Sequence, residues 1–88
     1  MTKKKKQQIV GTLGINYILT KTLEEFSELN HRLAKELIGD GDVAKLHEEM
    51  ADVKVWFEIL ESTLDKSMID KMVKLKSKKV LKKLNQSN

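Results

Sequence analysis

Apolar residues recur every three or four positions along two consecutive stretches of this chain, and that spacing is typical of amphipathic helices. The first stretch runs from about residue 16 to residue 38, and its recurring apolar residues are Leu19, Leu23, Phe26, Leu33 and Leu37. The second runs from about residue 43 to residue 64, and its seven-residue rhythm passes through Val43, Leu46, Met50, Val53, Phe57, Leu60 and Leu64. Both stretches are therefore predicted to be helices that bury one face.

The segment between these two predicted helices carries residues that suit the end of one helix and the start of the next. Gly39 suits the C-terminal cap of the first helix, because glycine readily adopts the left-handed backbone conformation that such caps use. Asp42 suits the N-terminal cap of the second helix, because its carboxylate can accept hydrogen bonds from backbone N–H groups. A connection this short predicts an antiparallel helical hairpin.

A third helix is predicted from about Ser67 to Leu84. Ser67 and Asp70 have the spacing of a capping box at its start, and eight lysines fall between Lys66 and Lys83. The sequence shows no internal repeat, no proline and no strand-like alternation. The predicted fold class is therefore all-α, with an antiparallel helical hairpin plus a third basic helix that together form an oligomeric helical bundle.

The two ends of the chain are more polar than its middle. Residues 1–8 are predicted to be a disordered basic tail, residues 9–85 a single all-α domain, and residues 86–88 a C-terminal tail. Just after the first tail, Gly11 and Gly14 argue against one uninterrupted helix. A chain of 88 residues exposes much of its surface, so oligomerisation or a bound ion is expected to stabilise it.

Charge is distributed unevenly along the chain. From Thr22 to Asp65 there are twelve acidic and four basic residues, whereas the remainder carries thirteen lysines and one acidic residue. Basic ends favour an anionic partner, either a small polyphosphate or nucleic acid bound through the termini. The chain has no cysteine and no apolar run near the roughly 20 residues that span a bilayer, so we expect a cytoplasmic protein without a membrane partner.

Two pairs of acidic residues lie within the two predicted hairpin helices. Glu25 and Glu28 form the first pair, and Glu49 and Asp52 form the second; residues three apart lie side by side on a helix. If the helices bring both pairs together, the like charges repel one another unless a cation lies between them. Oxygen ligands suit Mg²⁺, with Mn²⁺ as the alternative.

The position of the first pair can be estimated from the helical period of about 100° per residue. With Phe26 at the centre of the apolar stripe, Glu25 lies about 100° and Glu28 about 160° to the same side. The first pair is therefore expected at the margin of the core. A simpler alternative stays open, in which each pair is a solvated face and Thr22 and Glu25 form a capping box at a helix start.

The acidic segments together resemble a known motif. They read Glu24-Glu25-Phe26-Ser27-Glu28 and Glu49-Met50-Ala51-Asp52, with twenty residues between them. This arrangement is similar to the motif Glu-Glu-x-x-Glu followed by Glu-x-x-Asp in the MazG-like all-α nucleoside triphosphate pyrophosphatases, and the surrounding residues resemble the short phage-type members. The resemblance extends from about Leu13 to Leu84.

The resemblance implies a function and a set of site residues. It implies that Mg²⁺ is held by Glu25, Glu28, Glu49 and Asp52, with Glu24 as an additional acid of the catalytic site. The expected reaction is cleavage of a nucleoside triphosphate to the monophosphate and pyrophosphate, in the removal of surplus or non-standard nucleotides.

Further residues are expected to hold the substrate or the subunits together. Lys74 and Lys78, one turn apart on the basic helix, are the expected phosphate ligands. Trp56 is expected either to stack on the nucleobase or to fill a core or subunit interface. We expect a homo-oligomer, a dimer or tetramer, with an interface lined by the second predicted helix.

Two other functions remain open on the sequence. The first is a non-enzymatic helical adaptor or nucleic-acid-binding protein that uses its basic ends. The second is a degenerate relative that binds nucleotides without hydrolysing them.

Overall fold

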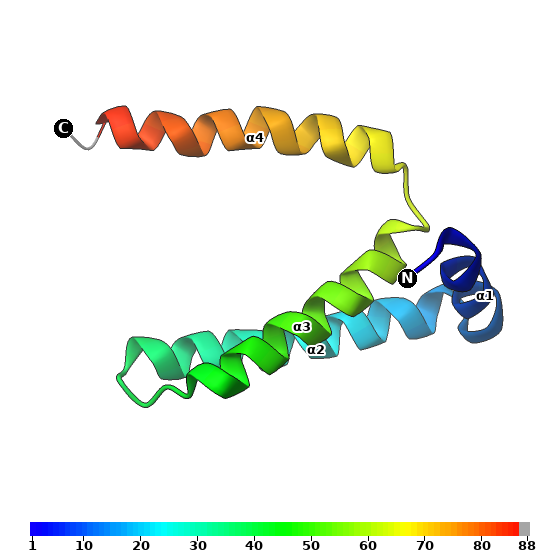
Figure 1. Cartoon of the computed structure of the whole chain (residues 1–88), viewed down its shortest axis with the longest axis horizontal. Coiled ribbons are helices and arrows are strands. Elements are labelled where there is room, and N and C mark those ends of the chain that lie inside the picture. Colours follow the sequence, from blue (N-terminus) through cyan, green and yellow to red (C-terminus); the bar gives the residue numbers. More distant parts are fainter. Residues whose placement is uncertain (87–88) are drawn as a thin grey trace.

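Residues 1–86 are described in the computed structural model, and they form four α-helices with no strand among them (Figure 1). The helices are α1 (Lys3–Leu13), α2 (Ile15–Leu37), α3 (Val43–Glu61) and α4 (Lys66–Gln86). The predicted all-α class is confirmed. None of these helices is both long and apolar enough to cross a lipid bilayer.

The N-terminal residues form helix α1, where the sequence predicted a disordered tail over residues 1–8. Thr2 caps the helix, because its Oγ1 accepts a hydrogen bond of 3.1 Å from the backbone N–H of Lys5. Lys6 also reaches α3, where its Nζ lies 3.5 Å from Oε1 of Glu58. A cap and a long-range ion pair thus hold a segment whose composition alone favours disorder.

Gly14 separates α1 from α2. Its φ of 83° lies in the left-handed region, which residues with a side chain rarely adopt. The N–H of Gly14 donates to the carbonyl of Val10 at 2.9 Å, and α2 begins at the next residue, Ile15. The prediction that glycine interrupts a single long helix is confirmed at Gly14, whereas Gly11 lies inside α1.

The turn between α2 and α3 uses the two predicted capping residues. Gly39 has a φ of 77°, and its N–H donates to the carbonyl of Glu36 while the N–H of Asp40 donates to that of Lys35. These two bonds define a Schellman motif. Asp42 caps α3 by accepting a bond of 3.2 Å from the N–H of Lys45. Figure 1 shows α3 returning alongside α2 after this turn.

The contact between α2 and α3 is the main packing interface of the described chain. Its buried apolar residues are Ile18 on α2 and Val53 and Ile59 on α3, and α2 also buries Thr22 and Glu25 there. The predicted orientation of the first hairpin helix is therefore wrong. The stripe centred on Phe26, which is 44 % exposed, lies outside the contact, and Glu25 lies inside it.

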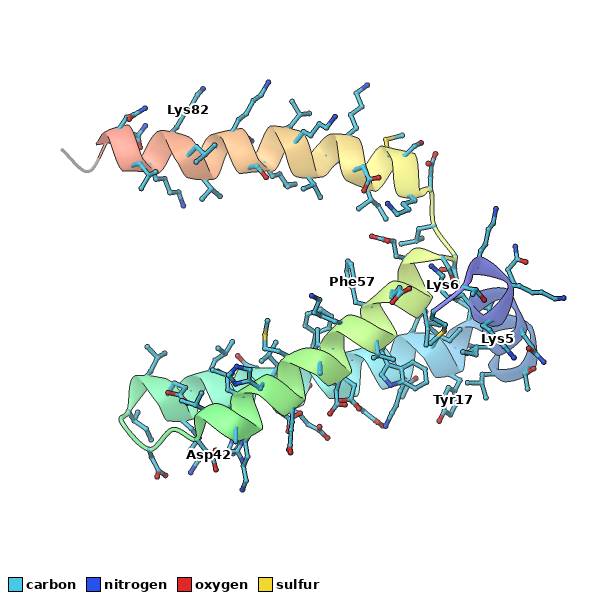
Figure 2. All side chains as sticks on the ribbon, in the orientation of Figure 1. Lys5, Lys6, Tyr17, Asp42, Phe57 and Lys82 are labelled. Carbon is cyan, nitrogen blue, oxygen red and sulfur yellow. The ribbon has the colours of Figure 1, made fainter. Side chains whose placement is uncertain are left out.

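The packing of α3 explains this difference. The apolar residues of α3 span a wide arc. The contact with α2 covers the part of this arc between Val53 and Ile59, and the part around Met50 and Phe57 stays exposed together with the Phe26 stripe of α2. In Figure 2, Phe57 and Tyr17 project from opposite sides of the pair.

Helix α4 begins differently from the prediction. Asp65, and not Ser67, is the capping residue, because its Oδ1 accepts from the N–H of Met68 at 3.1 Å and from the hydroxyl of Ser67 at 2.7 Å. Those two bonds lower the pKa of Asp65, with the Ser67 hydroxyl as the larger cause. Asp70 instead accepts from Nζ of Lys66 at 3.0 Å, so the predicted capping box is not formed.

Helix α4 stands apart from the α2–α3 pair (Figure 1). Every residue from 70 to 86 is exposed, which leaves both its lysines and its apolar residues in solvent. Of the predicted C-terminal tail, Gln86 is the last residue of α4, and residues 87 and 88 lie outside the described part of the chain.

Candidate metal centre

Four carboxylates from α2 and α3 converge on one point. Glu25 and Glu28 come from α2, Glu49 and Asp52 come from α3, and one oxygen from each residue lies within 4.8 Å of all the others. Oxygens on opposite sides of one ion are about 4.0–4.2 Å apart around Mg²⁺ and about 4.6–5.2 Å apart around Ca²⁺. The spacing of the four oxygens therefore fits a single shared cation.

The most buried member of this cluster is Glu25. Its residue is only 6 % exposed, and its Oε1 lies 3.3 Å from Nζ of Lys21, one turn earlier on α2. Its second oxygen, Oε2, is buried and has no hydrogen-bond partner, and the same holds for Oε2 of Glu49. An unpaired buried carboxylate oxygen is costly, so a cation at this point would satisfy two atoms at once.

One further buried oxygen without a partner lies away from the cluster. It is Oε1 of Glu36, near the C-terminal end of α2. Glu36 adjoins the turn, because the backbone N–H of Gly39 donates to its carbonyl. The cluster differs from Glu36 in having four carboxylates around the unpaired atoms.

The surroundings of Glu49 in the cluster disfavour its negative charge. Partial burial raises the pKa of Glu49, and a hydrogen bond with Glu28 and the negative charges of Glu28, Asp52 and Glu25 raise it further. Each of these causes disfavours the ionised form of Glu49. A divalent cation would reverse the effect of the neighbouring charges, because it favours the carboxylate form.

The structure excludes the capping role of Glu25. Thr22 lies within α2, where its Oγ1 donates to the backbone carbonyl of Ile18 at 2.7 Å, and α2 begins seven residues earlier at Ile15. Thr22 and Glu25 therefore do not start a helix. The buried position of Glu25 serves the contact with α3 and the carboxylate cluster.

Glu24 lies next to the cluster but outside it. Its side chain is 57 % exposed, and its Oε2 lies 3.5 Å from Nζ of Lys21. Lys21 thus bridges Glu24 and Glu25, and its pKa is raised, mainly by the hydrogen bond with Glu25. Sequence reasoning missed Lys21, although spacings of three and four to the two glutamates were the available signal.

Trp56 continues the acidic side of α3 and meets an aromatic residue of α2. Its ring centroid lies 6.1 Å from that of Tyr17, with an angle of 54° between the rings, which is a favourable tilted arrangement. Trp56 is half-buried, so packing is one of its roles. Beside Tyr17 a small hollow of about 100 Å³ is lined by Thr20, Lys21 and Glu24.

The two lysines expected to bind phosphate are not brought to this cluster by the single chain. Lys74 and Lys78 lie on α4 and are exposed, and α4 makes no extensive packing with α2 or α3 among residues 1–86. Their predicted role would need α4 of another copy or a different position of α4.

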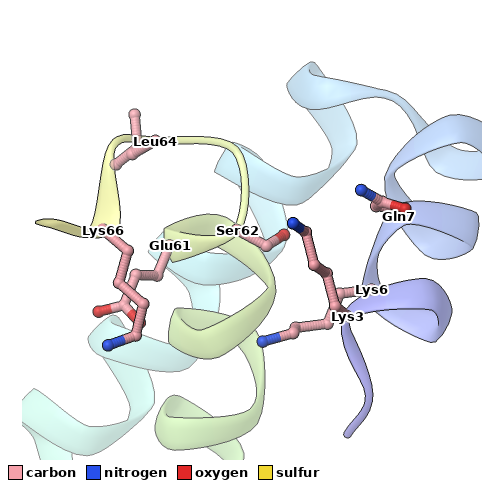
Figure 3. A pocket seen from close by; sticks show the side chains of 7 residues that line it. All are labelled: Lys3, Lys6, Gln7, Glu61, Ser62, Leu64 and Lys66. Atoms are coloured by element: carbon pink, nitrogen blue, oxygen red, sulfur yellow. The ribbon is translucent and has the colours of Figure 1, made fainter.

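A larger cavity lies elsewhere, between α1 and the junction of α3 with α4 (Figure 3). Its volume is about 390 Å³, and it is lined by Lys3, Lys6, Gln7, Glu61, Ser62, Leu64 and Lys66. Two of its lysines are already paired, Lys6 with Glu58 and Lys66 with Asp70. The cavity contains one carboxylate, Glu61, and so lacks the donor set of the cluster.

Comparisons with known proteins found no match for this chain among family models, curated proteins or solved structures. The likeness to the MazG-like pyrophosphatases stays a prediction from the sequence motif. The case for a functional site is the geometry of the four carboxylates.

Proposed function

We propose that this protein is a Mg²⁺-dependent nucleoside triphosphate pyrophosphohydrolase that works as a homo-oligomer. The observation that carries the proposal is the convergence of Glu25, Glu28, Glu49 and Asp52 within 4.8 Å, with a buried and unpaired oxygen on two of them. A donor set made only of carboxylate oxygens suits a hard divalent ion, Mg²⁺ or Mn²⁺, that also binds substrate phosphates.

The four carboxylates would hold the cation beside the triphosphate. A bound divalent cation would supply charge neutralisation at the phosphates and would make a nearby water molecule more acidic. Hydrolysis would form a bond between the water oxygen and the α-phosphorus and would break the bond between that phosphorus and the oxygen that bridges the α- and β-phosphates. The products are the nucleoside monophosphate and pyrophosphate.

Glu24 is the proposed acceptor for the proton that this water releases. It lies next to the cluster, outside the set of four ligand oxygens, and its side chain is largely exposed. A general base needs a carboxylate that does not bind the cation and lies within reach of the water. The four ligands would be occupied by the cation, whereas Glu24 is held only by its ion pair with Lys21. Lys21 keeps Glu24 and Glu25 in place through its two ion pairs.

The remaining substrate contacts are proposed from position and charge. The hollow beside Tyr17 and Lys21 is the proposed site for one end of the nucleotide, and Trp56, whose ring lies beside that of Tyr17, is the proposed contact for the base. Lys74 and Lys78 remain the proposed phosphate ligands on α4. Their replacement by alanine should raise KM more than it lowers kcat.

Release of pyrophosphate is the direct test. Purified protein is incubated with ordinary and modified nucleoside triphosphates, with Mg²⁺, with Mn²⁺ and with a chelator. We expect release from at least one nucleotide that requires the metal, and we expect Glu49→Gln to abolish it. Glu48→Gln is the matched control, because Glu48 is the exposed neighbour of Glu49 on the same helix and lies outside the cluster.

Two other outcomes identify the alternative functions. Nucleotide binding that depends on Mg²⁺ without pyrophosphate release indicates a relative that has lost hydrolysis. The exposed lysines of α4 favour nucleic-acid binding as the second candidate, and salt-sensitive DNA or RNA binding with no response to Mg²⁺ would support it.

A further inference from the structure

The cavity between α1 and the junction of α3 with α4 has the opposite charge to the metal centre. Its volume is about 390 Å³, and its lining includes the three lysines Lys3, Lys6 and Lys66 but only one acidic residue, Glu61. Figure 3 shows the lysines of α1 extending toward the end of α3, with Lys66 and Glu61 on the far side of the cavity. A cavity of this size suits a small molecule, and its excess of positive charge favours an anion.

Lys3 is the cation of this cavity that has no partner. Among residues 1–86 its side chain makes no ion pair and no hydrogen bond, whereas Lys6 lies 3.5 Å from Glu58 and Lys66 lies 3.0 Å from Asp70. An ammonium group has three N–H donors, so each paired lysine keeps donors for a second acceptor. All three lysines can therefore contact one anion in the cavity.

The ion pair of Lys6 with Glu58 also fixes the wall that α1 contributes. It joins α1 to α3, and Gly14, with a φ of 83°, separates α1 from α2 so that α1 takes its own direction. The lysines of the N-terminal segment are thus held on a helix beside the end of α3. A preformed arrangement of cations binds an anion better than a mobile tail does, because less conformational entropy is lost on binding.

The rest of the lining suits the uncharged part of a small phosphorylated molecule. Gln7 offers both an amide donor and a carbonyl acceptor. The hydroxyl of Ser62 donates to the carbonyl of Ile59 at 2.6 Å, so its oxygen remains an acceptor for a hydroxyl group of the ligand. Leu64 is 58 % exposed and, with the methylene groups of the lysines, offers apolar contact.

We propose that this cavity is a binding site for a small molecule that carries a phosphate group, with Lys3, Lys6 and Lys66 as the ligands of the phosphate. A phosphate group on a small molecule carries a charge of about −1.5 to −2 near pH 7. It is therefore attracted to three ammonium groups more strongly than a single carboxylate is. Lysine is a common phosphate ligand in proteins.

The proposed site is separate from the metal centre. Glu61 lies nine residues beyond Asp52 on α3, which is about 14 Å along the helix. Its lysines also differ from Lys74 and Lys78, which are proposed for the triphosphate substrate. The inference therefore goes beyond the hydrolase activity and does not depend on it, because the cavity needs no divalent cation to attract a phosphate.

The test is an NMR titration of the full-length protein in the absence of divalent metal ions. The probes are glycerol phosphate and inorganic phosphate, with glycerol as the uncharged control. We expect both phosphates to shift the amide signals of Lys3, Gln7 and Lys66, to leave those of Glu25 and Asp52 unchanged, and to bind less tightly as salt is added. Tighter binding of glycerol phosphate would identify a phosphate ester as the ligand, and equal binding would identify free phosphate; both results support the site.

Two substitutions that remove one charge each give a matched comparison. Lys3→Gln should weaken binding about tenfold. Lys4→Gln is the control and should have little effect, because Lys4 is the next residue of the same helix and does not line the cavity. Both residues are exposed, so neither change should alter the helical content measured by circular dichroism.

Glu61 provides a test of opposite sign. The pKa of Lys66 is raised mainly by Asp70 and further by the negative charge of Glu61, so Glu61 acts on a proposed phosphate ligand. Removal of that charge in Glu61→Gln should strengthen phosphate binding about threefold. Weaker binding by Glu61→Gln would contradict the proposed arrangement.

Three other results would overturn the proposal. The first is a titration in which neither phosphate shifts the signals of the cavity. The second is an equal loss of affinity in Lys3→Gln and Lys4→Gln, which would show a general attraction of phosphate to the basic end of the chain. The third is a loss of binding in Glu49→Gln, which would place the phosphate at the metal centre.

Discussion

Glu25 on α2 and Glu49 on α3 each have a buried Oε2 atom without a hydrogen-bond partner, and their ligand oxygens lie within 4.8 Å of one another. Both groups are acceptors when ionised, so neither can satisfy the other. A cation between them would satisfy both, and in its absence the pair lowers the stability of the fold. The cluster therefore links ion binding to stability.

Replacement of Glu49 by glutamine tests that link. We expect Mg²⁺ to raise the Tm of the wild-type protein, because an ion at about 100 times its Kd stabilises the native state by about 2.7 kcal/mol. In a domain of this size that corresponds to a shift on the order of 10 °C. Glu49→Gln should abolish the shift and Glu48→Gln should retain it. A wild-type Tm that does not change when Mg²⁺ is added would refute the metal centre.

Stability without metal should depend on pH through Glu49. Its pKa is raised in the folded protein above the ordinary value of 4.5. At a pH between the pKa of the unfolded protein and that of the folded protein, Glu49 therefore keeps its proton in the native state and has lost it in the unfolded state. Stability is therefore greatest below the ordinary value and falls as pH rises through the folded pKa. Tm measured in chelator from about pH 4 to about pH 8 should show this fall.

The contribution of Glu49 to the pH dependence of Tm is obtained by comparing the wild-type protein with Glu49→Gln. Other groups titrate in the opposite sense, among them Asp65, whose pKa is lowered. Glu49→Gln removes one titration and leaves the others, so the Tm of the variant should exceed that of the wild type increasingly as pH rises. If the difference in Tm between wild type and Glu49→Gln does not change with pH, folding does not shift the pKa of Glu49.

Lys21 should matter most when no metal is present. Its Nζ lies 3.3 Å from Oε1 of the buried Glu25, so Lys21→Met leaves that carboxylate without its ion pair. We expect a lower Tm in chelator and recovery of most of the loss with Mg²⁺. Lys35→Met is the control, because Lys35 makes an ion pair of the same 3.3 Å with the exposed Asp40, and exposed pairs contribute little.

At Gly39 the turn between α2 and α3 favours glycine because of its backbone conformation. Gly39 has a φ of 77°, so Gly39→Ala should cost about 1 kcal/mol in the free energy of unfolding. Gly11→Ala inside α1 should instead stabilise the protein by about 0.5–1 kcal/mol. A new Cβ would meet no atom within 4 Å at either position. Denaturant unfolding of the two variants should therefore give effects of opposite sign.

Features that depend on near neighbours were predictable from the sequence. The bounds of α2, the caps at Gly39 and Asp42 and the pairing of acids three residues apart follow from local spacing and backbone chemistry. The end of α3 at Glu61, three residues before the apolar rhythm stops at Leu64, departs only slightly from that pattern.

Features that depend on distant contacts were not predictable in the same way. Helix α2 has two faces that can pack, and periodicity alone does not tell which one meets α3; the structure buries Glu25 and exposes Phe26. Similarly, composition favoured disorder for the first residues, yet α1 is held partly by the ion pair of Lys6 with Glu58, a residue far along the chain. Such contacts appear only when the tertiary arrangement is known.

The short turn at Gly39 also determines which residues of α2 and α3 lie near one another, the acidic residues included. Glu28 lies nine positions before the last residue of α2, and Asp52 lies nine positions after the first residue of α3. Counting outward from the bend thus brings the acids of the two helices within about one helical turn of each other, close enough for all four to converge. An insertion or deletion of one residue between the bend and the acids would slide one pair of acids past the other by about 1.5 Å and rotate it by about 100°. This chain should therefore tolerate length changes in the outer ends of the helices far better than between the bend and the acids.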